Sequence, residues 1–249
     1  MPILIDELSL FFPCHNEEEN LLPLVDEALA SLPTLATRYE VIIVDDGSTD
    51  GTAAVAARLV AAHPGVVRLV RHEKNRGYGG ALRSGFAAAT MRFVAFTDGD
   101  RQFRVADLSL LLHVARERST PVTVGFRLRR ADPLVRRMYA GVYRFANRFW
   151  FSLNVRDVDC AMKLFDRRVL TDISIASNGA FVSAELLIKL RAAGVAIKEV
   201  GVPHFPRTAG SASGARLSVV LAAVRDFWSL RLALWRDRNA ALRRGEPLL

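Results

Sequence analysis

Short apolar runs alternate with amphipathic helical patterns through the first half of this chain. Apolar runs at 8–13, 41–44, 66–70, 93–97 and 121–125 predict buried strands, because they lack the polar alternation of a half-exposed strand. Helices are predicted between them, over 20–31, 52–62, 79–89 and 106–117, where apolar residues recur every three or four positions. This order predicts an α/β fold, with a mainly parallel sheet flanked by helices on both faces.

The second half of the chain has a different character. Strand-like runs occur at 161–166 and 196–205, and long helical patterns occupy 136–151 and 215–238. No internal repeat, low-complexity tract or linker separates the two halves, so the chain is predicted to form a single domain.

Polar residues follow three of the predicted strands at the point where each strand ends. Such residues end strands and cap helices in many proteins, and Ser48 and Asp50 could simply cap the helix that follows. Three clusters at one edge of a parallel sheet, however, converge on the crevice where such sheets bind ligands. The residues that reach this crevice are Asn16 and Glu17, Asp45 and Asp46, and Asp98 and Asp100.

The charge balance of the 249 residues points to an anionic partner. The net charge is +8 and the pI is about 10.2, and nearly all of the positive charge is arginine. The basic residues are dispersed and no nucleic-acid motif occurs, so a nucleotide, a phosphorylated lipid or a membrane surface is expected rather than nucleic acid. Two distant cysteines, an acidic N-terminal segment and no long uncharged apolar run predict a cytoplasmic protein that works at most on a membrane surface.

Four segments together resemble one enzyme family. FFPCHNEEENL, EVIIVDDGSTDGT, NRGYGGALRSGF and FTDGDRQF, in this order and spacing, resemble the inverting family 2 glycosyltransferases. The similarity covers about residues 8–210 and is greatest to the branch with dolichyl-phosphate mannose synthase and the polyprenyl-phosphate glycosyltransferases. It implies a glycosyltransferase-A (GT-A) fold with a Rossmann-like nucleotide-binding sheet. The implied catalytic domain is 1–214, with a nucleotide-sugar half at 8–126, an acceptor half at 127–214 and a basic amphipathic helix at 215–249.

The resemblance assigns the donor side of the site to the strand ends. It implies that a nucleotide sugar is bound by Pro13, Asn16, Glu17, Asp45, Asp46, Ser48, Asn75, Arg76, Gly77, Asp98, Gly99 and Asp100. It further implies that Asp98 and Asp100, with Gln102, hold Mg²⁺ or Mn²⁺ on the donor diphosphate, which suits the oxygen ligands that these cations prefer. The glycines of GYGG are not a P-loop and are expected to allow close packing at a helix start.

The acceptor side is expected to use cations rather than a base. In the polyprenyl-phosphate branch the nucleophile is a phosphate oxygen, which is already largely ionised at neutral pH. The resemblance places Arg127, Lys163 and Arg207 near acceptor or donor phosphates, with Asp159 as a further catalytic candidate. The implied reaction is metal-dependent transfer of a hexose, with inversion, from a GDP-mannose or UDP-glucose type donor to a polyprenyl or dolichyl phosphate.

A sugar hydroxyl or another soluble acceptor stays open as the alternative. Such an acceptor needs a carboxylate base, for which Asp157, Asp159 and Glu185 are candidates. Glu185 could equally be an exposed helical residue paired with Lys189, four positions on. A dehalogenase-type phosphatase, a sugar nucleotidyltransferase and a basic membrane- or nucleic-acid-binding protein fit the motif order and the acidic strand ends less well.

Two helical segments combine arginines with aromatic residues. In 136–151, Arg137, Arg144 and Arg148 lie beside Met138, Val142, Phe145 and Phe149. In 215–238, Val220, Val224, Phe227, Leu230 and Trp235 occur with Arg225, Arg231, Arg236 and Arg238. Basic amphipathic helices can lie in the headgroup layer, which predicts peripheral binding at the inner face of the cell membrane. Their apolar faces could instead pack on the core, on another subunit or on a membrane-anchoring partner.

The chain also departs from the pattern common in this branch. Gly99 stands where the branch often has alanine, Cys160 where it has serine and Lys163 where it has arginine, and Gly214 replaces a lysine. The sugar, the base and the acceptor are therefore not fixed by the resemblance.

Overall fold

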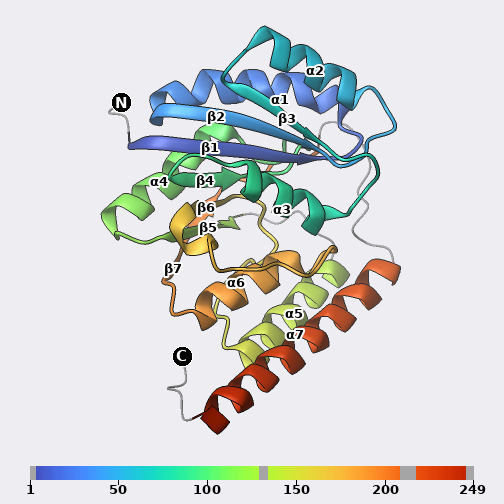
Figure 1. Cartoon of the computed structure of the whole chain (residues 1–249), viewed down its shortest axis with the longest axis vertical. Helices are drawn as coiled ribbons and strands as arrows, with labels where there is room; N and C mark the ends of the chain where they lie inside the picture. Colours follow the sequence, from blue (N-terminus) through green and yellow to red (C-terminus); the bar gives the residue numbers. More distant parts are fainter. Residues whose placement is uncertain (1–3, 129–133, 208–216, 245–249) are drawn as a thin grey trace.

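One seven-stranded sheet organises the chain, with helices on both of its faces (Figure 1). The computed structural model describes the backbone of residues 4–128, 134–207 and 217–244, and the side chains of 4–128, 141–207 and 219–236. The strands stand in the order β3-β2-β1-β4-β6-β5-β7. Their bounds are β1 Ile5–Cys14, β2 Ala36–Asp45, β3 Val67–Arg71, β4 Phe93–Phe96, β5 Val122–Arg127, β6 Lys163–Asp166 and β7 Ile197–Val202.

The sheet is mainly parallel, as predicted, and β6 is its antiparallel strand. The first residue of β6, Lys163, pairs with Phe96 at the end of β4 and with Val124 of β5, so β6 starts where β4 ends. Strands β1 and β2 begin earlier than their apolar runs, because backbone pairing from Ile5 and Ala36 onward does not depend on buried side chains.

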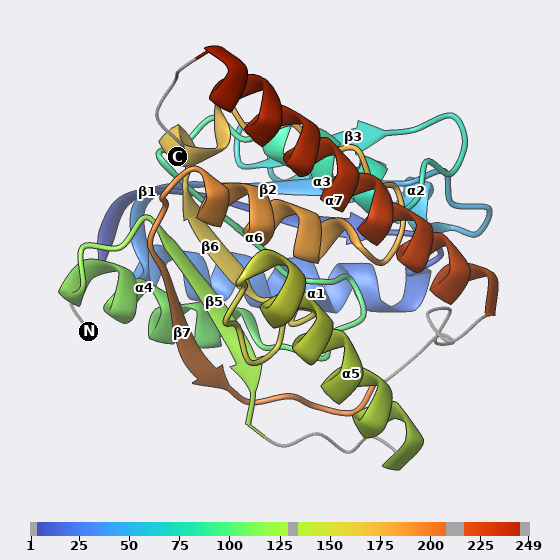
Figure 2. The same ribbon diagram turned by 90° about the horizontal axis from the view of Figure 1, so that it is seen from below.

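The helices form two layers, which Figure 2 shows on either side of the sheet. Helices α1 (Glu18–Ser31) and α4 (Leu108–Glu117) cover one face, and α2 (Thr52–Ala62) packs on α1. Helices α3 (Tyr78–Ala88) and α6 (Val182–Ala192) cover the other face. Short 3-10 turns follow α1 (Leu32–Thr34), precede α4 (Val105–Asp107) and follow β6 (Arg167–Leu170). The predicted helices and strands of the first half are therefore confirmed, with ends shifted by a few residues.

An aromatic cluster joins α3 to the sheet. The ring of Phe86 on α3 meets Phe11, Phe96 and Phe165 edge to face, with centroids 5.1, 5.9 and 5.5 Å apart. These rings are buried and come from β1, β4 and β6, so three neighbouring strands share one packing unit. Edge-to-face pairs add to the free energy of burial, which fixes α3 against the strands whose ends carry the acidic residues.

Helices α5 (Leu134–Phe151) and α7 (Leu217–Arg244) lie on the far side of α6 from the sheet (Figures 1 and 2). Phe227 of α7 meets Phe151 at the end of α5 and Phe181 before α6, with centroids 4.8 and 5.9 Å apart. Within the described residues, no helix has the length and apolar character needed to span a membrane.

Candidate active site

The ends of β1, β2 and β4 bring five acidic residues to one edge of the sheet. Strand register places Cys14 beside Asp45, and Phe11 beside Phe96, so the residues after β1 and β4 also meet. We call this cluster the acidic edge: Glu17, Asp45, Asp46, Asp98 and Asp100. The convergence predicted from the strand ends is confirmed by this register.

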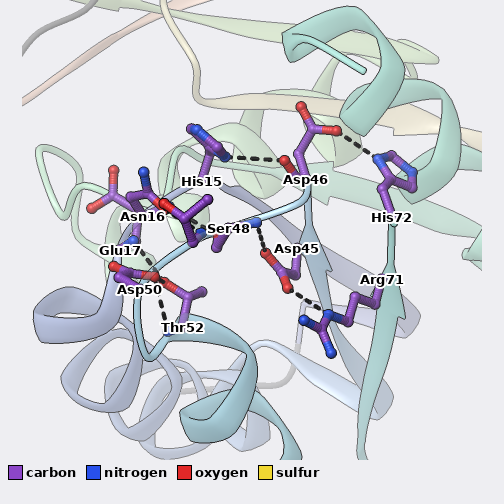
Figure 3. Close-up of polar contacts among 11 residues, drawn as sticks. His15, Asn16, Glu17, Asp45, Asp46, Ser48, Asp50, Thr52, Arg71 and His72 are labelled. Atoms are coloured by element: carbon purple, nitrogen blue, oxygen red, sulfur yellow. Dashed lines mark hydrogen bonds and ion pairs between the residues drawn. The ribbon is translucent and has the colours of Figure 1, made fainter. Parts of the chain in front are cut away.

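The loop after β1 is bound to the loop after β2 by hydrogen bonds (Figure 3). The backbone N–H of Asn16 donates to Ser48 Oγ at 2.9 Å, and the N–H of Glu17 donates to Thr52 Oγ1 at 2.9 Å. In return Asn16 Oδ1 accepts the N–H of Thr49 at 2.8 Å. Asn16 adopts a φ of 57°, a left-handed conformation that asparagine tolerates. Ser48 therefore links the two loops, and neither loop can move without the other.

Asp50 is not the N-cap residue of α2, which is Gly51, but it bonds to the first residue of that helix. Its Oδ1 accepts the N–H of Thr52, the first residue of α2, at 3.0 Å. This carboxylate is therefore used for the helix start rather than for the acidic edge.

Asp46 is buried and is held from three directions. Its Oδ1 lies 2.6 Å from His72 Nδ1 and accepts the N–H of Arg76 at 2.8 Å, while its carbonyl oxygen accepts a hydrogen bond from His15 at 3.0 Å (Figure 3). The far nitrogen of His72 contacts Ser84 of α3 at 2.8 Å. Asp46 thus connects β2 to the segment that opens α3.

Asp45 is fully buried and has one oxygen without a hydrogen bond. Oδ1 accepts the N–H of Ser48 at 3.0 Å. Oδ2 has no hydrogen-bond partner among the described residues, and the Nε of Arg71 lies 3.4 Å away as an ion pair (Figure 3). A buried acceptor left unsatisfied costs free energy, so Asp45 Oδ2 is suited to a donor group of a ligand.

Glycines allow the start of α3 to approach the segment 177–178 closely. Gly77 has a φ of 80°, and a Cβ there or at Gly79 would collide with the backbone of 177–178. Asn75 Oδ1 accepts the N–H of Gly77 at 2.9 Å. The close packing expected of GYGG is confirmed by these contacts.

Asp98 and Asp100 have different partners. The hydroxyl of Tyr78 donates to Asp98 Oδ1 at 2.7 Å. Asp100 Oδ2 accepts from the guanidinium of Arg207 at 2.7 Å, and its Oδ1 accepts the N–H of Gln102 at 3.1 Å. The side chain of Gln102 donates to the carbonyl of Phe205 at 3.2 Å, which ties the segment before Arg207 to this loop.

Burial and neighbouring charge raise the pKa of two carboxylates of the acidic edge. Burial, and then the charge of Asp100, raise the pKa of Asp98 to about 6, although the Tyr78 hydrogen bond and the charges of Lys163 and Arg207 oppose this shift. Burial, opposed by Arg207, also raises the pKa of Glu17, whose Oε1 lies 3.5 Å from that guanidinium. The carboxylates are therefore only partly neutralised by the chain's own cations.

Close packing explains why position 99 is a glycine, which the sequence alone does not reveal. A Cβ at this position would lie 2.9 Å from Cys14 Sγ and 3.3 Å from the carbonyl oxygen of Pro13. The end of β1 therefore leaves no room for a side chain between Asp98 and Asp100. Burial, followed by the charges of Glu17 and Asp45, keeps the pKa of the Cys14 thiol well above its usual value.

The three basic residues predicted to bind phosphates differ in how deeply they are buried. Arg207 is partly exposed and lies between Asp100 and Glu17. Arg127 is held by Asp157, which accepts from its Nε at 2.7 Å and from Nη2 at 2.8 Å. Lys163 is fully buried: its ammonium donates to the Cys160 carbonyl and lies 5.5 Å from the centroid of the Phe96 ring, and burial lowers its pKa. Lys163 in this position has no exposed surface with which to contact a phosphate.

The three candidates for a general base also differ in burial and in their partners. Asp157 is buried against Arg127. Glu185 pairs with Lys189 at 2.7 Å as expected, but it is buried rather than exposed, because it accepts the N–H groups of Ala176 and Ser177 at 2.9 and 2.7 Å. Asp159 is exposed, and its charge acts on Tyr78, Tyr143 and Lys163.

Tyr78 and His72 were not anticipated from the sequence. Tyr78 lies inside the NRGYGG motif, so its place beside the glycines is the one signal that could have identified it. His72 follows β3, and only the pairing of β3 with β2 brings it to Asp46.

The fold and the acidic edge define a glycosyltransferase of the GT-A type. Chains of known structure with the same fold include glucosyl-3-phosphoglycerate synthase from Mycobacterium tuberculosis, with a TM-score of 0.70 and 22% identity over 97% of this chain and 81% of that one. A mannosyltransferase from Pyrobaculum calidifontis, in complex with GDP-Man and Mn²⁺, has a TM-score of 0.62 and 18% identity over 86% and 61%.

The sequence model of glycosyl transferase family 2 matches residues 9–174, and the chain belongs to this family. An uncharacterized glycosyltransferase of Mycobacterium tuberculosis is 33% identical over 90% of this chain and 98% of its own length. The dodecaprenyl-phosphate galacturonate synthase of Rhizobium johnstonii is 29% identical over 70% of this chain, and the human dolichyl-phosphate beta-glucosyltransferase 32% identical over 65%. The aligned regions span 52% and 55% of these last two relatives, so they cover about half of each.

Proposed function

We propose that the chain transfers a hexose from a nucleoside-diphosphate sugar to the phosphate of a polyprenyl lipid, with a divalent cation and with inversion. The observation that carries this proposal is the acidic edge itself, where Asp45, Asp98 and Asp100 converge with Arg207. Relatives named for dodecaprenyl-phosphate and dolichyl-phosphate chemistry support the lipid phosphate as acceptor.

The nucleoside would lie over the ends of β1 and β2. The unsatisfied Oδ2 of Asp45 would accept a hydrogen bond from the base or the ribose. Asn16, Glu17 and Ser48 border the same position, since their loops are bonded to each other. Pro13 lies one residue before the end of β1, and the backbone of Asn75, Arg76 and Gly77 lies on the other side, where Arg76 bonds to Asp46.

The diphosphate would lie over Asp98 and Asp100. Two neighbouring carboxylates suit a divalent cation, and burial together with the charge of Asp100 already raises the pKa of Asp98; a cation there would remove the repulsion that Arg207 offsets only in part. Such a cation, held by Asp98 and Asp100 with Gln102 nearby, would stabilise the negative charge of the leaving diphosphate. Gly99 belongs to this site because it lets the two aspartates pass close to Cys14.

The transfer step would need no general base. An ionised phosphate oxygen forms the new bond to the anomeric carbon while the bond from that carbon to the nucleoside diphosphate breaks, so inversion follows from a single displacement. Arg207 and Arg127 would bind the phosphates, and Arg127 is preorganised by its two hydrogen bonds to Asp157. Lys163 would act without touching the substrates, because its buried charge favours the ionised form of Asp98.

A soluble acceptor is the second candidate, and the structural similarity to glucosyl-3-phosphoglycerate synthase motivates it. A hydroxyl acceptor would need a base, and Asp159 is the exposed carboxylate among the three candidates. If the acceptor is a hydroxyl, Asp159→Asn removes transfer. If it is a lipid phosphate, the same variant retains most of it.

Thermal stability in the presence of nucleotide sugars tests the donor half of this proposal. UDP-, GDP- and dTDP-sugars are added singly, with and without Mn²⁺, to the folded protein. We expect one base to raise the melting temperature, with a larger rise when Mn²⁺ is present, because binding to the native state stabilises it. Stabilisation by none of these sugars would contradict the proposal.

A further inference from the structure

A pocket outside the acidic edge is lined by three arginines. It has a volume of about 310 Å³ and lies between the outer side of α5 and the segment 154–156. Arg144 and Arg148, one helical turn apart on α5, form one side, and Arg156 forms the other. All three side chains are exposed, and none of the described residues that line the pocket carries a carboxylate.

The positive charge of this pocket is largely unopposed. Within the described part of the chain, Arg144 and Arg148 form no ion pair. The acid whose charge acts on Arg144 and Arg156 is Glu199, which is half-buried on β7 and accepts the backbone N–H of Arg156 at 2.7 Å. Three guanidinium groups around one cavity match the oxygens of a phosphate group.

An exposed apolar face begins next to the arginine pocket. Phe145, which lines the pocket, is 68% exposed, as is Val142, and Phe149 is 67% exposed. Trp150 meets Trp228 of α7 with centroids 5.1 Å apart, so the exposed apolar residues of the two helices are in contact there. We call this surface the α5–α7 face; its exposed members are Val142, Phe145, Phe149 and Trp150 on α5, and Val220, Leu221, Val224, Trp228, Leu232 and Trp235 on α7.

We propose that the arginine pocket binds the phosphate of an anionic phospholipid while the α5–α7 face enters the headgroup layer, so that the protein docks on a membrane. Amphipathic helices with arginines beside exposed aromatic and aliphatic residues are suited to this layer, where the charges meet phosphates and the apolar groups meet acyl chains. The inference deepens the proposed function and rests on it, because a polyprenyl phosphate acceptor is found in such a layer.

Two other occupants fit the surface less well. A second copy of the chain in a twofold dimer would bring two arginine pockets toward each other, and like charges would repel across the interface. A nucleic acid would satisfy the arginines but would leave the aliphatic side chains of Val142, Leu221 and Leu232 in water. A lipid surface satisfies both parts at once.

The position of the two helices in the chain connects docking to the acceptor side of the site. Helix α5 begins at Leu134, soon after Arg127, and α7 begins at Leu217, soon after Arg207. Both arginines are phosphate-binding residues in the proposed function. Each docking helix is therefore joined by a short stretch of sequence to a residue proposed to meet the lipid phosphate.

Vesicle flotation tests the docking proposal. The full chain is mixed with phosphatidylcholine vesicles that contain or lack phosphatidylglycerol. We expect the wild type to float with the anionic vesicles, and the triple variant Arg144→Gln/Arg148→Gln/Arg156→Gln to bind them roughly a hundredfold more weakly. A matched variant, Arg58→Gln/Arg116→Gln/Arg118→Gln, removes three exposed charges from α2, from α4 and from the residue that follows α4, and should float as the wild type does.

A second variant tests the apolar face. Phe145→Ser/Phe149→Ser changes two exposed side chains, so it should fold normally and still lose flotation. Equal flotation of the wild type and the triple variant would overturn the proposal. So would a wild type that binds inorganic phosphate or RNA at these arginines but not vesicles, or one that self-associates through this face instead.

Donor binding and transfer to a water-soluble short-chain prenyl phosphate separate this inference from the proposed function. Both should be unchanged in the two docking variants, because none of the altered residues belongs to the proposed donor or acceptor site. Failure of the wild type to transfer to the soluble acceptor would count against the proposed function, whatever the flotation result.

Discussion

The acidic edge and the α5–α7 face use polar and apolar groups in opposite ways. At the acidic edge three of the five carboxylates are buried, and all five have hydrogen-bond partners within the chain, as Asp46 has in His72 and Asp100 in Arg207. On the α5–α7 face large apolar side chains stand exposed and contact mainly one another, as Phe145 does Phe149 and Trp150 does Trp228, and exposed arginines lie beside them. The acidic edge is therefore organised around paired charges. The α5–α7 face instead exposes apolar surface, which suits the membrane docking proposed above.

Loss of Asp100 should have the largest effect on the acidic edge. The Asp100→Ala variant removes a proposed cation ligand and the partner of Arg207, so transfer should fall about a thousandfold. The Mn²⁺-dependent part of the donor-induced thermal shift should disappear as well. Asp172→Ala, at an exposed acid away from the site, is the control and should change neither quantity.

Tyr78 tests whether Asp98 is positioned by a hydrogen bond. Tyr78→Phe keeps the ring and removes the hydroxyl that donates to Asp98 at 2.7 Å. Affinity for Mn²⁺ in the presence of donor should fall roughly 10–100-fold, as it does when a metal ligand loses its orienting partner. Isothermal titration with Mn²⁺ measures this change, and Tyr39→Phe on β2 is the control. Unchanged affinity would mean that Asp98 needs no such support.

The burial of the Asp98 carboxylate and its repulsion from Asp100 should lower the stability of the metal-free protein. The folded pKa of Asp98, about 6, exceeds the usual value of 3.8, so the folded state binds the proton more tightly and the free energy of unfolding rises as pH falls through this window. Asp98→Asn should therefore be more stable than wild type by about 1–2 kcal/mol at pH 8 in EDTA.

Urea unfolding across pH checks this third prediction. The advantage of Asp98→Asn should shrink toward pH 4, where the wild-type carboxyl is protonated as well. A variant that is less stable than wild type at pH 8 would show that Asp98 is satisfied without a cation.

The contact between Gly99 and Cys14 predicts a smaller effect. Gly99→Ala should cost about 1 kcal/mol of stability, because the added Cβ would press on Cys14 Sγ and the Pro13 carbonyl. Cys14→Ala should relieve part of this cost in the double variant, which a double-mutant cycle measures as a favourable coupling. Additive effects of the two changes would rule out the contact as the reason for Gly99.

Two leucines of α7 should differ in their effect on the free energy of unfolding, and the exposed one should have the smallest effect of all the changes considered. Leu232 is 51% exposed on the α5–α7 face, so Leu232→Ser should change the free energy of unfolding by less than about 0.5 kcal/mol. Leu230, two positions away, is buried, and Leu230→Ser should cost several times more. Equal costs in urea unfolding would mean that the face is covered within the protein.

The strand ends show what the sequence could predict. Parallel strands place their carboxyl ends together, so the convergence of Asp45 with Asp98 follows from the apolar runs before them. The close packing at the start of α3 was predictable too, because glycine weakens a helix and is favoured there mainly where another segment approaches, as at Gly77 and Gly79.

Contacts between distant segments account for what was missed. Glu185 looked exposed in its own helix, but the segment at 176–177 lies over it and donates two N–H groups. Lys163 begins β6, and its burial depends on α6 and the Phe96 ring, which no local pattern reveals. The apolar residues of α7 divide in a similar way: Phe227 and Leu230 pack inward, while Val220, Val224 and Trp235 are exposed.

Sugar transfer to a lipid phosphate is the most direct test of the central claim. The protein is incubated with Mn²⁺, the radiolabelled form of the nucleotide sugar that stabilises it, and a polyprenyl phosphate in detergent micelles. We predict label in the organic phase as an acid-labile sugar phosphate of the lipid, and none with Asp100→Ala. Label that stays entirely in water-soluble products, with a wild type that binds the donor, would contradict the account.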